Sequence, residues 1–192
     1  MDFDYPTVLR NVVSSQNIET ALIIFAQGSV LRQRFVEIIP DYLEFIEVSE
    51  NSTPSVQDIL YSLENSKGEN IILLSNHKDL IGICNQAIEL SKKKVSLIST
   101  KNFIEGISAV LAYSSVKNFD LNIKSMNRAI EDIKTCFVKV SVKDVEFDGL
   151  HIKKGDFIGI IEDEIMAKSG KKDEVLKKIM ARIDIKQRLV SV

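Results

Sequence analysis

The sequence predicts an α/β fold: a parallel four-stranded sheet flanked by helices, followed by a smaller α+β part with antiparallel hairpins. Short runs that are apolar on both faces recur through the first half of the chain, and amphipathic segments separate them. Strands buried on both faces and joined by helices are typical of parallel sheets. After about residue 114 the pattern changes to strict alternation and an Asp148-Gly149 turn, which is typical of antiparallel hairpins.

The α/β part is expected at residues 21–114, after a polar tail or linker at residues 1–20. Stretches of helical periodicity follow each strand and place apolar residues on one stripe. Thr53-Pro54 favours a helix start, because threonine caps free N–H groups and proline loses no hydrogen bond at the first helical position. Asn76 is expected to cap the next helix in the same way. The predicted strands are 21–26, 42–48, 71–74 and 94–98.

The second part is expected at residues 115–192. It begins with an amphipathic helix and continues with an alternating strand and the Asp148-Gly149 hairpin. The sequence Leu189–Val192 resembles the start of a further strand, so this part is expected to be incomplete. The predicted elements are a helix at 121–133, strands at 138–142, 145–147, 150–152, 157–161 and 164–166, and a helix at 171–182.

The composition excludes several classes of protein. Lysine and arginine number 25 against 27 acidic residues, a net charge of −2, whereas nucleic-acid binders carry a basic excess. The two cysteines and two histidines lie far apart, without the spacing of metal ligands. No apolar run is long enough to span a bilayer. We therefore expect a cytoplasmic protein with reduced cysteines, no metal, no cofactor, no nucleic-acid partner and no transmembrane segment.

Polar residues follow every predicted strand of the parallel sheet. Ligands of open α/β sheets bind beyond the carboxyl ends of the strands, and free N–H groups at helix starts favour anions. The sequence therefore predicts a ligand- or partner-binding edge there, although the same residue types also serve as ordinary helix caps. The candidate residues are Gly28, Ser29, Ser52, Thr53, Ser55, Ser75, Asn76, His77, Lys78, Thr100 and Lys101.

No residue is predicted to be catalytic. The chain has no nucleophile elbow, no Walker A sequence and no dinucleotide-binding fingerprint. His77 is the only histidine near the candidate edge, and a general base needs an orienting partner. An enzyme of its own would depend on His77 or Lys101, so it is the least favoured of three alternatives.

Several segments together resemble the C-terminal region of the bacterial fatty acid kinase subunit, which is related to dihydroxyacetone kinases and has a DegV-like fold. The resemblance covers about residues 20–192. The matching segments are Thr53–Leu60, Ile71–Lys78, Asn85–Ala87, Ser99–Lys101, Gly106–Ala112, Ala129–Thr135 and Phe147–Ile160.

This resemblance implies a non-catalytic role. In the family, a separate N-terminal domain binds nucleotide and phosphorylates a fatty acid held by a DegV-like carrier, and the C-terminal region docks that carrier. The implied partners are a DegV-like fatty-acid-binding protein and the kinase N-terminal domain, in the same or a separate chain; a homodimer is also compatible. Residues 48–53 replace a glycine-rich loop of the family, which puts a pocket there in question. The alternative is a stand-alone binder of an acyl or phosphate group.

Overall fold

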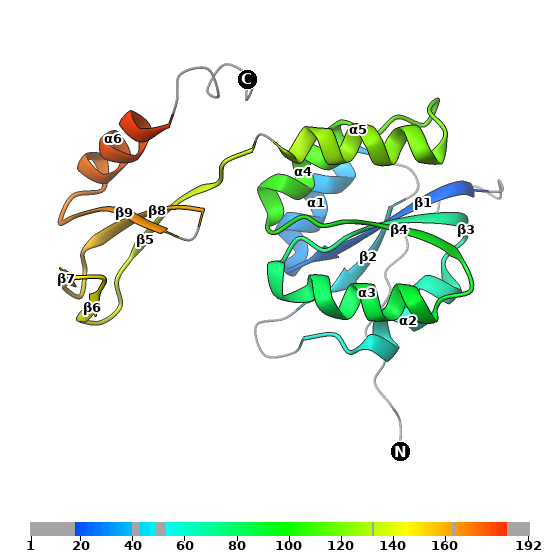
Figure 1. Ribbon diagram of the computed structural model, residues 1–192, viewed down its shortest axis with the longest axis horizontal. Helices are drawn as coiled ribbons and strands as arrows, with labels where there is room; N and C mark the ends of the chain where they lie inside the picture. Colours follow the sequence, from blue (N-terminus) through cyan, green and yellow to red (C-terminus); the bar gives the residue numbers. More distant parts are fainter. Residues whose placement is uncertain (1–17, 40–42, 49–52, 132, 163, 184–192) are drawn as a thin grey trace. The chain divides into compact units, whose positions relative to one another are not determined.

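Four parallel strands form one sheet in the order β2-β1-β3-β4 (Figure 1). They are β1 (Ile18–Ala26), β2 (Leu43–Glu47), β3 (Gly68–Leu74) and β4 (Lys94–Ile98). The predicted parallel sheet is confirmed. The computed structural model describes residues 18–39, 43–48, 53–131, 133–162 and 164–183. Of the tail predicted at 1–20, residues 1–17 lie outside the described part, and residues 18–20 are the first residues of β1.

Helices cover both faces of this sheet. For that reason every residue of β1 from 21 to 26 and of β3 from 71 to 74 is apolar and buried. Leu22 and Ile24 enter one core cluster, whereas Ile23 and Phe25 enter the other, because successive side chains of a strand point to opposite faces. Figure 1 shows helices α1 (Gly28–Ile38), α4 (Phe103–Leu111) and α5 (Phe119–Glu131) on one face, and α2 (Val56–Asn65) and α3 (Ile81–Leu90) on the other. The three-residue helix η1 (Lys78–Leu80) precedes α3.

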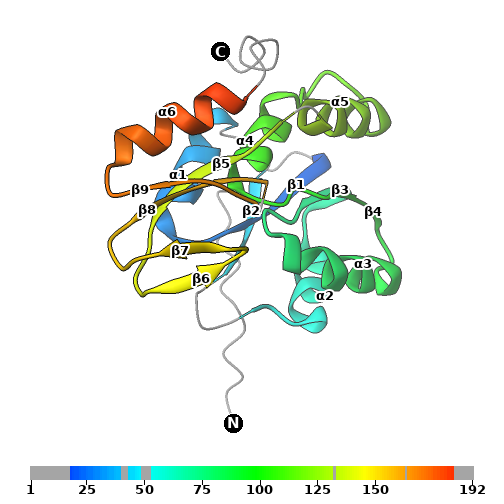
Figure 2. The same cartoon turned by 60° about the vertical axis from the view of Figure 1, so that its left-hand side comes forward.

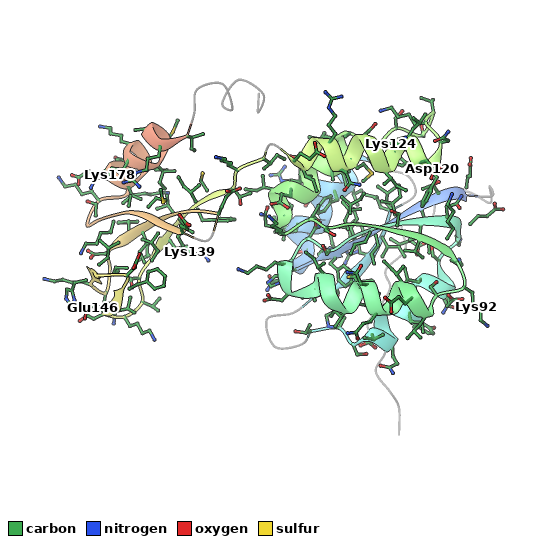
Figure 3. All side chains as sticks on the ribbon, in the orientation of Figure 1. Lys92, Asp120, Lys124, Lys139, Glu146 and Lys178 are labelled. Carbon is green, nitrogen blue, oxygen red and sulfur yellow. The ribbon has the colours of Figure 1, made fainter. Side chains whose placement is uncertain are left out.

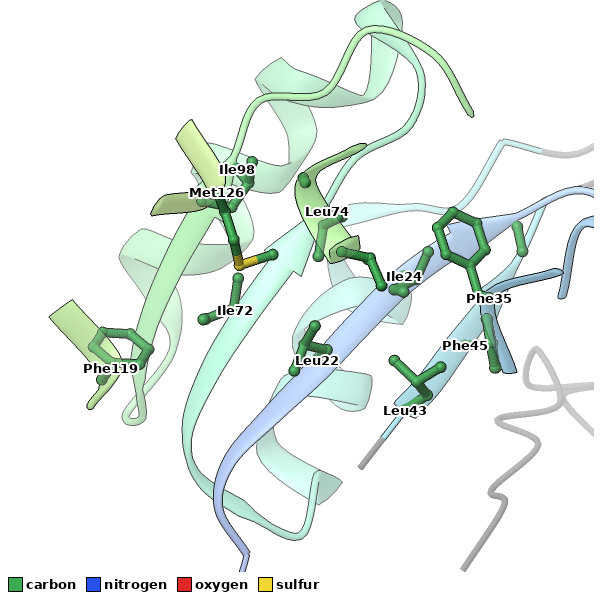
Figure 4. Close-up of a cluster of buried hydrophobic side chains, with 13 residues drawn as sticks. Leu22, Ile24, Phe35, Leu43, Phe45, Ile72, Leu74, Ile98, Phe119 and Met126 are labelled. Carbon is green, nitrogen blue, oxygen red and sulfur yellow. The ribbon is translucent and has the colours of Figure 1, made fainter. Parts of the chain in front are cut away.

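Helix α5 belongs to the first compact unit, which extends to residue 131, whereas the sequence placed a boundary at 114. The helix buries Phe119 and Met126 in the same cluster as Leu22 and Ile72 (Figure 4). The Lys94 ammonium lies 4.5 Å from the centroid of the Phe119 ring, which fixes the start of the helix against β4. The core of the first unit therefore needs α5 to cover the last strand.

The second unit, residues 132–192, contains a three-stranded antiparallel sheet in the order β5-β8-β9. Its strands are β5 (Cys136–Val140), β8 (Phe157–Ile161) and β9 (Glu164–Ser169), and helix α6 (Lys172–Arg182) covers one face (Figure 2). The predicted hairpin is confirmed as β6 (Val145–Phe147) and β7 (Leu150–Ile152), with Asp148 and Gly149 at φ 49° and 73°. The strand predicted from Leu189 lies outside the described residues.

Candidate functional site: the rim of the parallel sheet

All four strands of the parallel sheet end on the same side of the first unit, where the sequence places the binding edge. We call it the rim and define it by the residues that follow the strands: 27–29, 53–55, 75–79 and 99–102. Of the eleven candidate residues, Ser52 lies outside the described part of the chain, and the other ten lie on the rim. Their hydrogen bonds determine which of them can meet a ligand.

Asn76 is the centre of the rim. Its backbone has φ 49°, a left-handed conformation that asparagine tolerates better than most residues. Its side-chain Nδ2 donates to the carbonyl of Phe25 at the end of β1, 3.1 Å away. The Thr100 hydroxyl donates to Asn76 Oδ1 at 2.9 Å and accepts from the Asn76 backbone N–H at 2.8 Å. One side chain therefore ties together the ends of β1, β3 and β4.

Ser75 completes this network. Its hydroxyl donates to the carbonyl of Thr100 at 2.8 Å, and both residues are fully buried. Three candidates, Ser75, Asn76 and Thr100, are thus brought together as the sequence predicted, but they bond to one another and to Phe25. Asn76 does not cap the following helix, which corrects the sequence-based expectation.

Gly106 of α4 lies against the rim residue Asn76, a contact that sequence reasoning missed. A Cβ atom at this position would lie 2.1 Å from Asn76 Oδ1 and 2.7 Å from Asn76 Cγ. Only glycine lets the helix approach the asparagine amide this closely. The sequence contains no signal for this contact, because it joins residues about thirty positions apart.

The start of α4 is closed by its own side chains. Asn102 Oδ1 accepts from the backbone N–H groups of Ile104 and Glu105. The buried Glu105 carboxylate accepts from the Lys101 backbone N–H at 2.7 Å and from Asn102 Nδ2 at 3.1 Å. Sequence reasoning also missed this pair, although asparagine followed three positions later by glutamate is a recognisable helix start. The Lys101 side chain remains exposed.

The start of α2 is closed in the same manner, but by Ser55 and not by Thr53 as predicted. The Ser55 hydroxyl accepts from the Asp58 N–H, and the Asp58 carboxylate accepts from the Ser55 backbone N–H at 2.8 Å. This reciprocal pair is a capping box. Thr53 is exposed, and Pro54 is buried ahead of the helix.

His77 caps η1, next to the exposed Lys78. The Asp79 backbone N–H donates to His77 Nδ1 at 3.3 Å. That nitrogen is then an acceptor, so the Asp79 carboxylate 3.7 Å away forms no ion pair with it in this state. The histidine therefore has a structural task that accounts for its position.

The start of α1 differs from the other three. Gln27 stands at the cap position and makes no side-chain hydrogen bond to the helix, and Gly28 and Ser29 are exposed. Gly28 has φ 76°, which explains why glycine occupies this position. In the part of the chain that the structure describes, this is the one rim helix start without a side-chain cap.

The cysteines lie outside the rim. Burial raises the pKa of the Cys84 thiol to about 12, so this cysteine is a protonated core residue. Burial also raises the pKa of Cys136, and the nearby Glu162 charge adds to the shift. Among the described residues, no group of three or more histidine, cysteine or acidic side chains is arranged to hold a metal. The described helices include none with the length and apolar character of a membrane span.

Comparison with curated proteins finds relatives that are longer than this chain. An uncharacterised protein of Staphylococcus epidermidis is 28% identical over 169 residues, which cover 88% of this chain and 30% of that relative. One from Staphylococcus haemolyticus is 30% identical over 152 residues, covering 79% of this chain and 27% of the relative. This chain therefore spans less than a third of the length of these relatives.

Solved structures share the fold at low sequence identity. The native dihydroxyacetone kinase of C. freundii aligns with a TM-score of 0.57 and 12% identity, over 88% of this chain and 38% of that chain. The same enzyme in complex with AMP-PNP and Mg²⁺ gives 0.54 and 12%, over 92% and 39%. The model of the FakA-like C-terminal family of fatty acid kinases matches residues 21–191. The chain therefore belongs to the FakA-like C-terminal family, a kinase-associated domain.

Proposed function

We propose that this chain is a non-catalytic, cytoplasmic partner-binding domain of a fatty acid kinase-like protein. In this proposal it docks a DegV-like fatty-acid carrier, so that a separate nucleotide-binding domain can phosphorylate the acyl carboxylate. Membership of the family supports the kinase context. The short coverage of the relatives is consistent with further domains elsewhere in the complete protein.

The observation that carries the non-catalytic assignment is the hydrogen bonding of the central rim residues. In an open α/β enzyme the reacting groups gather at the carboxyl ends of the strands. Here the side chains of Ser75, Asn76 and Thr100 form hydrogen bonds with one another and with the ends of neighbouring strands. The buried Glu105 and the half-buried Asp58 hold the starts of α4 and α2. Such a rim is a scaffold, and binding of a protein partner requires no reacting group from it.

Three measurements test the proposal. The purified chain should bind a DegV-like carrier in a calorimetric titration and should show no ATP turnover, with or without fatty acid. Adding the nucleotide-binding domain should restore acyl phosphate formation in the presence of the carrier. ATP turnover by the chain alone, lost on changing His77 or Lys101 to alanine, would assign catalysis to the rim and contradict the proposal.

A second candidate function rests on the uncapped start of α1. The exposed N–H groups near Gly28 and Ser29 could receive a phosphate or an acyl carboxylate without a carrier. This alternative predicts shifts of the Gly28 and Ser29 amide signals on titration with inorganic phosphate or with a medium-chain fatty acid. Unchanged amide signals, together with carrier binding, would exclude this alternative and retain only the docking function.

A further inference from the structure

Strand β5 of the second unit has an open edge. Among the described residues of this unit, β5 pairs with β8 alone in the sheet order β5-β8-β9. The Ser141 N–H donates to the Asp156 carbonyl, and the Glu162 N–H donates to the Thr135 carbonyl. Backbone groups alternate in direction along an antiparallel strand, so the N–H and C=O groups of odd-numbered β5 residues point to β8. The N–H and C=O groups of Cys136, Val138 and Val140 consequently point away from the sheet.

Apolar side chains of α6 line this edge. Val175 and Ile179 are the buried core residues of the helix. Glu174 and Lys178, one position before them, bond to Ser169 and Lys168 of β9.

Leu176 and Met180, one position after the buried pair, therefore lie on the opposite side of the helix, toward β5. They are 38% and 51% exposed, and Val140 of the strand is 52% exposed. Leu176, Met180 and Val140 thus form an apolar surface beside the open backbone edge, which we call the apolar shoulder.

The charges on this edge are mainly of one sign. Between residues 133 and 143 the chain carries lysines at 134, 139 and 143 and no acidic residue. The Lys139 ammonium, labelled in Figure 3, stands 5.9 Å from the centroid of the Phe137 ring on the exposed face of the strand. Helix α6 adds Lys172 and Lys177 near Leu176, against the exposed Asp173 on the same side.

We propose that the β5 edge is the docking site for an extended, acidic segment of the carrier, which adds as a strand to the β5-β8-β9 sheet. The inference rests on the proposed docking function and names its surface. Outward N–H and C=O groups select an extended backbone, Leu176 and Met180 select aliphatic side chains, and the lysines select acidic ones. A second copy of this chain fits less well, because edge lysines disfavour pairing of like strands.

The test compares proline substitutions on the two edges of the sheet. Val138→Pro removes an outward N–H of β5 and no bond within the sheet. Ile165→Pro is the matched control on β9, since Ile165 faces Ile160, whose backbone groups point to β5. In calorimetric titrations with the carrier, Val138→Pro should weaken binding by about tenfold or more, the equivalent of at least one hydrogen bond. Ile165→Pro should bind like the parent protein.

A pair of surface variants keeps the test valid if a proline variant fails to fold. Met180→Gln, which replaces the apolar side chain by a neutral polar one, should weaken binding by about tenfold, the effect expected from losing one apolar contact at an interface. Leu90→Gln, which changes a side chain that is 62% exposed on α3, is the matched control and should bind normally. Hydrogen exchange of the Val138 N–H should be fast in the isolated protein and slow in the complex.

The outcomes separate the two proposals. Carrier binding that neither Val138→Pro nor Met180→Gln weakens would overturn the edge site and leave the docking function intact. Failure of the parent protein to bind the carrier would overturn both. A Val138 N–H already protected in the isolated monomer would mean that the chain covers its own edge, and protection that depends on protein concentration would mean that a second copy does. Either result would overturn the edge site alone.

Discussion

Gly106→Ala should destabilise the first unit although it replaces a helical glycine by the best helix former. The new Cβ would lie 2.1 Å from Asn76 Oδ1 and 2.9 Å from Asn76 Nδ2. The amide cannot swing aside freely, because it is bonded to Phe25 and Thr100 at 3.1 and 2.9 Å. The substitution therefore has to break both hydrogen bonds or displace α4.

The magnitude follows from these two effects. Loss of two hydrogen bonds costs about 1 kcal/mol each, or about 2 kcal/mol each if the buried partners stay unsatisfied. Replacing glycine by alanine inside a helix returns about 1 kcal/mol. The expected loss in the free energy of unfolding is therefore about 1–3 kcal/mol, measured by urea denaturation followed by circular dichroism.

Two further variants make the experiment decisive. Gly82→Ala in α3 is the matched control, because a Cβ there meets no atom within 4 Å; it should stabilise by up to about 1 kcal/mol. Asn76→Gly keeps the left-handed backbone and removes the amide. In that background Gly106→Ala should cost nothing. Equal stability of Gly106→Ala and Gly82→Ala in the parent protein would refute the account of the rim.

Three other predictions follow from local contacts. Ser55→Ala should cost about 1 kcal/mol of stability in urea denaturation through loss of the α2 cap, whereas Thr53→Ala should cost almost nothing. Hydrogen bonds from the Ser91 hydroxyl and the Lys92 N–H lower the Glu64 pKa below its ordinary 4.5. The folded state thus favours the ionised form, so this contribution is present above about pH 4.5 and fades as the pH falls through the lower folded pKa. Glu64→Gln should flatten the stability profile in that acidic range. Gly159→Ala should loosen α6, because its Cβ would lie 2.4 Å from Ile179 Cδ1; proteolysis should then cut the second unit faster and leave the first unchanged.

The sheet could be predicted because its signals are local. Doubly buried strands such as 71–74 need apolar residues at every position, and this requirement is visible without knowing the neighbours. The same holds for Asp148-Gly149, where the turn geometry itself demands residues that tolerate positive φ. The strand order β2-β1-β3-β4 was not predictable in this way, because it depends on pairing between distant segments.

The roles of the rim residues could not be predicted, because serine, threonine and asparagine serve equally as helix caps, strand-to-strand links and ligand groups. What distinguishes these roles is the partner, and for Asn76 the partners lie 51 and 24 positions away in the chain. Ser55 was separable from Thr53 only by its acid three residues later. The predicted domain boundary at 114 differs from the structure for the same reason. Helix α5 joins the first unit through contacts with β4 that no local pattern encodes.

The two units use their polar backbone and side-chain groups in opposite ways. On the rim, Asn76 and Glu105 satisfy groups that would otherwise be buried without partners, which is a large stabilising effect and leaves little for a ligand. On the β5 edge, the backbone groups of Val138 point away from β8, and water can satisfy such groups at little cost. An incoming strand displaces that water and gains modestly per hydrogen bond, so its affinity has to come from the apolar shoulder at Met180 and from charge. A surface built in this way suits the reversible docking that we propose.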